Sequence, residues 1–226
     1  MIDWFKQINI YCERTDFSLW SEPLNFLSNA GFFLASYAAY QKAKSQNCLH
    51  EPFVLCAIIL SALIGVGSGL FHSLATLWAQ GADILGIGVY VLCFLAFWNL
   101  KALQLNRTQL GLAFLGLIVP TAGFVALLEP MLGESSAYLG ILCYLVFLGI
   151  KERQLPAKQS YLLKASVIFA ISIVFRTIDL AICDHVPMGT HFIWHGLNAL
   201  VIFLSLSSLL SQYQNNSSDY KPSQGK

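Results

Sequence analysis

Apolar residues form a series of long runs along the chain, separated by short polar breaks. Each run is continuous rather than alternating, which is typical of helices and not of membrane β-strands. Most runs approach the ~20 residues that a helix needs to cross the hydrocarbon core of a bilayer. We therefore predict an all-α integral membrane protein, a seven-transmembrane helix bundle, with spans at Leu24–Tyr40, Phe53–Leu74, Ala82–Leu100, Leu110–Leu128, Ala137–Ile150, Tyr161–Cys183 and Thr190–Leu210.

The composition agrees with this prediction. Of 226 residues, 56% are hydrophobic and 11% are charged, whereas soluble domains carry about 25% charged residues. The net charge of +1 argues against a nucleic-acid-binding surface. We expect three regions: an outer N-terminal segment (1–23), a transmembrane domain (24–210), and a polar, disordered cytoplasmic tail (211–226).

The positive charges predict an orientation. Lysine and arginine follow the first, third and fifth spans and recur in the tail, but none follows the second, fourth or sixth. The positive-inside rule then places the N-terminus outside and the C-terminus inside. Only Lys6 and Arg14 oppose this, and acidic residues surround them. The short loops and the lack of a retention signal favour a bacterial inner membrane, with the active site facing outward.

Three histidines are expected at one membrane depth, near the outer ends of their helices. His72 lies at the end of the second span, whereas His191 and His195 open the seventh and share one helix face. A single membrane histidine is about as often a packing residue as a functional one. Three at one depth favour a metal site, because ionisable groups in membranes are costly and usually functional. Three neutral imidazoles are the ligand set of a catalytic zinc, which keeps a fourth position open.

Two further polar residues are predicted beside these histidines. Ser68 lies one turn below His72, and Asp83 opens the third span on the same side of the membrane. Both are candidate catalytic residues. The alternatives are a helix N-cap for Asp83 and a small residue that permits close helix packing for Ser68.

These residues resemble the motifs of the alkaline ceramidases, within a wider group of seven-helix proteins that includes adiponectin- and progestin-type receptors. The matching positions are Ser68-x3-His72, Asp83, His191-x3-His195, Cys12-Glu13, Glu22-x2-Asn25 and Ser28-Asn29. The resemblance implies a zinc-dependent hydrolase that cleaves ceramide, or a ceramide-like membrane lipid, to a fatty acid and a sphingoid-type base. Asp83 would then transfer protons and Ser68 would stabilise the oxyanion.

Two other functional classes remain as alternatives. A receptor-like or non-catalytic lipid-binding member would use the zinc structurally, and it would need neither Asp83 nor Ser68. A metal transporter would need a polar path across the bilayer, whereas the inner halves of the spans hold few acids or histidines.

The resemblance also implies calcium near the zinc, because a similar N-terminal segment holds calcium in alkaline ceramidases. Glu13, Glu22 and Asp16 are the candidate ligands here. The aspartate and asparagine usual in the family are replaced by Ile10 and Thr15, which predicts weak binding because calcium needs six to eight oxygens. The alternative is a solvated acidic segment.

Two pairings are predicted on the outer side. Cys12 and Cys183 are candidates for a disulfide in an oxidising compartment. Arg176 and Asp179, three residues apart on the sixth span, are expected to form an ion pair.

Overall fold

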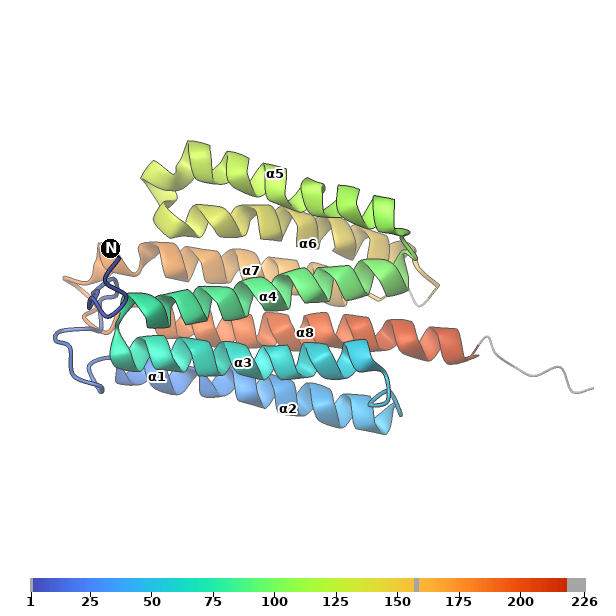
Figure 1. Cartoon of the computed structure of the whole chain (residues 1–226), viewed down its shortest axis with the longest axis horizontal. Coiled ribbons are helices and arrows are strands. Elements are labelled where there is room, and N and C mark those ends of the chain that lie inside the picture. Colours follow the sequence, from blue (N-terminus) through green and yellow to red (C-terminus); the bar gives the residue numbers. More distant parts are fainter. Residues whose placement is uncertain (1, 157–158, 219–226) are drawn as a thin grey trace, which may run out of the picture.

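A computed structural model describes residues 2–156 and 159–218, and every regular element in them is a helix. The long helices run side by side as a bundle (Figure 1). The helices are the short α1 (Pro23–Ser28) and the long α2 (Ala30–Ser45), α3 (Pro52–Leu74), α4 (Leu77–Ala102), α5 (Arg107–Leu132), α6 (Ser136–Gln154), α7 (Tyr161–Ile178) and α8 (His191–Ser218), with short 3-10 turns η1 (Gly133–Ser135) and η2 (Leu180–Ile182).

The helices agree with a multi-pass membrane protein. Among the described residues, five helical stretches are long and apolar enough to cross a membrane, and they are α3, α4, Arg107–Gln154, α7 and His191–Tyr213. The stretch Arg107–Gln154 contains α5, η1 and α6, and α5 folds back beside α6 (Figure 1). The number of crossings and their direction stay predictions.

Several predicted boundaries are corrected. The first predicted span is divided at Asn29 into α1 and α2, and the sixth ends at Ile178 before the turn η2. The third span was expected from Ala82, but α4 begins at Leu77, directly after a tight turn in which Ala75 has a left-handed φ of 47°.

The last helix also differs from its prediction. Helix α8 continues to Ser218, so residues 211–218 of the predicted tail are helical, and residues 219–226 lie outside the described part. Within the bundle α8 contacts α1, α2, α3, α4 and α7, and its buried side chains include Leu206, Leu209 and Leu210. This central position explains why α8 can carry residues of a buried site.

One end of the bundle, here named the site end, gathers segments that are far apart in sequence. It comprises residues 2–22, the α3–α4 turn, η1 and residues 179–190 (Figure 1). The N-terminal segment is fixed there by backbone hydrogen bonds from Ile8 to Ala75 (2.8 Å) and from Leu77 to Lys6 (3.0 Å). A disulfide joins Cys12 to Cys183, whose Cα atoms are 5.2 Å apart. The segment 2–22 therefore forms part of the folded site end.

Candidate metal centre

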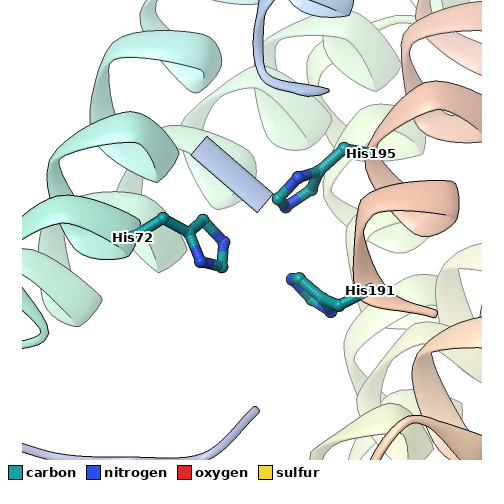
Figure 2. Close-up of side chains that lie close together, drawn as sticks. All are labelled: His72, His191 and His195. Atoms are coloured by element: carbon teal, nitrogen blue, oxygen red, sulfur yellow. The ribbon is translucent and has the colours of Figure 1, made fainter. Parts of the chain in front are cut away.

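The three predicted histidines converge inside the site end. His72 projects from the last turn of α3, and His191 and His195 project from the first two turns of α8 (Figure 2). Their ring centroids are 4.6–5.2 Å apart, and no ring is more than 3% exposed. One potential ligand atom from each lies within 4.8 Å of the others, and the described residues contain no other such group of His, Cys, Asp or Glu.

His72 is oriented by a buried glutamate. Its Nδ1 lies 2.6 Å from Oε2 of Glu22, and Oε1 of Glu22 forms an ion pair with Arg14. Burial raises the pKa of Glu22, but the hydrogen bonds from His72 and Asn25 and the charge of Arg14 lower it overall. Because an ionised carboxylate only accepts, Nδ1 carries the proton and Nε2 keeps its lone pair. That Nε2 is buried and has no hydrogen-bond partner.

His195 is oriented in the same way by main chain and a hydroxyl. Its Nδ1 lies 3.1 Å from the carbonyl oxygen of Asn25 and 2.7 Å from Oγ of Ser28. A carbonyl cannot donate, so Nδ1 carries the proton and Nε2 again keeps its lone pair. Oγ of Ser68 lies 3.4 Å from that Nε2.

His191 is held by its backbone and by stacking. Its N–H donates to Oδ1 of Asp179 (3.0 Å), as does the N–H of Thr190 (2.6 Å), so Asp179 caps the start of α8. The ring stacks on Tyr11 with centroids 3.9 Å apart, and Nδ1 is buried with no hydrogen-bond partner. The expected Arg176–Asp179 ion pair is therefore wrong. Arg176 instead donates to Glu134 (2.8 Å).

These three imidazoles fit a zinc ion. His72 and His195 have a carboxylate or a carbonyl on the far nitrogen, as zinc-bound histidine usually does. Nε2 of His72 is buried without a partner, which is costly, and a cation shared with the other two imidazoles would satisfy it. Three protein ligands also leave a fourth position free, as catalytic zinc sites do.

A cavity of about 470 Å³ adjoins the histidines. Its walls include Ser68, Asp83, His191 and His195, so both predicted catalytic residues share one space with two of the histidines. Oδ1 of Asp83 is buried and has no hydrogen-bond partner among the described residues. Asp83 lies inside α4, whose N-cap is Thr76, so the alternative role as a cap is excluded.

The N-terminal acids are not brought together as a cation site. The carboxylate of Glu13 accepts from the N–H groups of Leu24 (2.6 Å) and Asn25 (2.8 Å) at the start of α1. Asp16 is exposed and accepts from the N–H of Ser18 (2.8 Å). Glu22 faces His72. The prediction of calcium at these three acids therefore gains no support.

Sequence reasoning missed the contacts between the N-terminal segment and the histidines. Glu22 contacts His72 across 50 residues of chain, and Asn25 contacts His195 across 170. No periodicity signals contacts of this length. The signal in the sequence is the pattern Glu22-x2-Asn25, which matches the family motif but predicts a calcium ligand at Glu22 and no contact with a histidine.

Comparison with known proteins agrees with this geometry. The family model described as Ceramidase matches residues 10–223, which include every residue of the site. A search of curated proteins finds no match to the chain. The match covers nearly the whole chain and confirms the resemblance inferred from the motifs, and it supports a hydrolase that acts on the amide bond of a lipid. The chain belongs to the ceramidase family.

Proposed function

We propose that this protein is a zinc-dependent membrane hydrolase that cleaves ceramide, or a ceramide-like lipid amide, to a fatty acid and a sphingoid-type base. The observation that carries the proposal is the convergence of three histidines, two of which line one cavity together with Asp83 and Ser68. Membership of the ceramidase family supports the lipid amide as substrate.

His72, His191 and His195 would hold the zinc. A zinc ion there supplies Lewis-acid chemistry, which polarises an amide carbonyl and makes water a stronger acid. Glu22 and the Asn25 carbonyl keep the proton on the far nitrogen of their histidines, so the ligating lone pairs point inward.

Asp83 is suited to move the proton. An amine leaves an amide only poorly unless it is protonated, so hydrolysis needs one group that takes a proton from water and delivers it to nitrogen. The Asp83 carboxylate borders the cavity with an unpaired oxygen, and no other side chain competes for that oxygen. Its burial also keeps bulk water from exchanging the proton away.

Ser68 is suited to stabilise the carbonyl oxygen as it becomes negative. Its hydroxyl lies beside Nε2 of His195, the nitrogen that would face the zinc. A donor aimed at developing charge is worth most in such a buried site. Gly67 already supplies the close helix packing, because a Cβ there would be 3.0 Å from the carbonyl oxygen of Ala82.

The cavities suit a lipid. A second, apolar cavity of about 80 Å³ shares walls with the first, including Phe32, Ile64 and Trp194, and would accept part of a hydrocarbon chain. The larger cavity is also lined by Ile84 of α4 and Val125 of α5, which are partly exposed on the bundle surface. A two-chain lipid would therefore enter laterally from the bilayer, between α4 and α5.

The distribution of Lys and Arg supports a site end that faces outward and a C-terminus in the cytoplasm, in a bacterial inner membrane. A topology reporter fused after Lys226 tests this. A cytoplasmic signal is expected, and a signal from the opposite side would place the site at the inner leaflet.

Product analysis tests the proposed reaction most fully. The purified, zinc-loaded protein is incubated with a panel of lipid amides that differ in head group and acyl length, and free fatty acid and amine are measured by mass spectrometry. Release of both from a ceramide, and not in Asp83→Asn, is expected. Tight lipid binding without cleavage of any panel member would favour the receptor-like alternative, which the family match does not favour.

A further inference from the structure

Arg14 is a buried cation at the site end. Its side chain is 1% exposed, and it forms an ion pair with Glu22. The guanidinium also donates to three main-chain carbonyls: Asp16 (2.9 Å), Ser18 (3.5 Å) and His72 (2.8 Å). A buried charge is costly unless it is paired and hydrogen-bonded, and here a carboxylate and carbonyls surround it. Proteins offer the same oxygen set to a hard metal ion.

The guanidinium reaches one histidine by two routes. It donates directly to the carbonyl oxygen of His72, and through Glu22 it contacts Nδ1 of the same residue. Arg14, Glu22 and His72 thus form a closed ring of contacts. The ring fixes both the main chain and the imidazole of His72 and leaves its Nε2 aimed at the other two histidines.

We propose that Arg14 is a built-in cation that takes the place of a bound metal ion in the N-terminal segment, and that it is a positioning residue for the zinc ligand His72. The proposal rests on the proposed zinc site. The cation that balances Glu22 is then supplied by the chain itself. We therefore expect added calcium to leave the wild-type zinc site unchanged.

Removal of Arg14 has a defined physical consequence. The Glu22 carboxylate would lose the donor that holds its Oε1, so it would be free to rotate away from His72. That rotation breaks the contact that orients His72. Loss of such a partner typically weakens metal binding by about 10–100-fold.

The test is zinc affinity, measured by competition with a chelator for the wild type, Arg14→Ala, Arg14→Lys and Lys6→Ala. Lys6→Ala is the matched control, because it removes an exposed positive charge from the same segment. We expect Arg14→Ala to bind zinc about 10–100-fold more weakly. The zinc affinity of Arg14→Lys should lie between those of the wild type and Arg14→Ala, because an ammonium keeps the charge but lacks the planar, forked donors of a guanidinium.

The effect of added calcium or methylguanidinium on zinc affinity provides a second measurement. Neither cation would change that affinity if Arg14 only stabilised the fold. Calcium at about 1 mM, the range of weak extracellular sites, should leave zinc affinity of the wild type unchanged. Either cation should restore part of the affinity of Arg14→Ala, by filling the oxygen set that Arg14 vacates. If Arg14→Ala does not fold, the same comparison is made with Arg14→Lys.

Three negative outcomes are distinguishable. Wild-type protein that binds no zinc would contradict the proposed function and remove the basis of this inference with it. Wild-type protein that binds zinc, with Arg14→Ala and Arg14→Lys binding it within twofold of the wild type, would overturn only the role of Arg14. Wild-type zinc affinity that rises with calcium would overturn the claim that Arg14 replaces a metal.

Discussion

The two ends of the bundle bury polar side chains in different ways. At the end opposite the site, Glu152 accepts from the N–H of Leu162 (2.8 Å), and the indole N–H of Trp98 donates to Ser208 (2.8 Å). These contacts cap or connect helices. At the site end, His72, His191 and Asp83 each keep a buried atom without a partner, and the three histidines bring one potential ligand atom each within 4.8 Å of the others.

The difference shows which buried polar groups indicate function. Glu152 and Asn99 also keep one unpaired oxygen each, but neither belongs to a group of His, Cys, Asp or Glu that could hold a metal ion among the described residues. At the site end the potential ligand atoms of three histidines come from two helices and lie within 4.8 Å of one another. Burial of a polar group alone therefore signals packing, whereas convergence of potential ligand atoms signals a bound ion.

The largest expected effect is on catalysis at the site end. Asp83→Asn has nearly the same volume but cannot take up a proton at neutral pH, so kcat/KM should fall by about 10²–10⁴-fold. Zinc content should stay at the wild-type level, because Asp83 is not among the convergent ligands. Activity within a few-fold of the wild type would show that another group transfers the proton.

Ser68→Ala should have the next largest effect. Loss of one donor to the developing oxyanion lowers kcat by about 10²-fold, with little change in KM. The matched control is Ser61→Ala in the same helix, where the hydroxyl is buried against Ser36 at 2.6 Å and outside the larger cavity. Equal losses of activity in the two variants would reduce Ser68 to a packing residue.

Removal of the Cys12–Cys183 link should affect stability more than chemistry. The bond closes a sequence separation of 171 residues, and such links typically contribute about 2–4 kcal/mol. Cys12→Ser with Cys183→Ser should lower the unfolding temperature under oxidising conditions and abolish the effect of reductant. A wild-type unfolding temperature that ignores reductant would argue that the bond does not form in the protein as isolated.

The smallest effect on the site is expected from a substitution at the opposite end of the bundle. Glu152→Gln keeps an acceptor for the Leu162 N–H, so it should cost about 1 kcal/mol of stability and leave zinc binding unchanged. Glu22→Gln is the same substitution at the site end, and it should weaken zinc binding. Equal zinc affinities for the two variants would mean that the two ends do not differ as described.

The helices and the zinc ligands could be predicted because their signals are local or additive. Continuous apolar runs indicate helices, and the i, i+4 spacing of His191 and His195 needs only one helix. His72 could be placed beside them because successive spans cross the membrane in opposite directions. The end of the second predicted span and the start of the seventh then lie on the same side. The all-helical fold and the convergence of these three residues follow from such patterns.

The partners of these ligands could not be predicted, because they depend on tertiary contacts. Spacing within one helix suggested Arg176 with Asp179, yet packing sends Arg176 to Glu134 on η1 and Asp179 to the start of α8. Likewise, the position of Arg14 against Glu22 depends on how residues 2–22 fold over the bundle. The charge pattern alone predicted that those acids bind calcium.

Zinc content is the most direct test of whether His72, His191 and His195 bind zinc. The purified wild type, His195→Ala and His50→Ala are analysed for metal after dialysis, with His50 as the control because its side chain is 67% exposed at the opposite end. A zinc site with three protein ligands predicts about one zinc per chain in the wild type and in His50→Ala. It predicts a sharp loss of zinc in His195→Ala. Unchanged zinc in His195→Ala, or no zinc in the wild type, would contradict it.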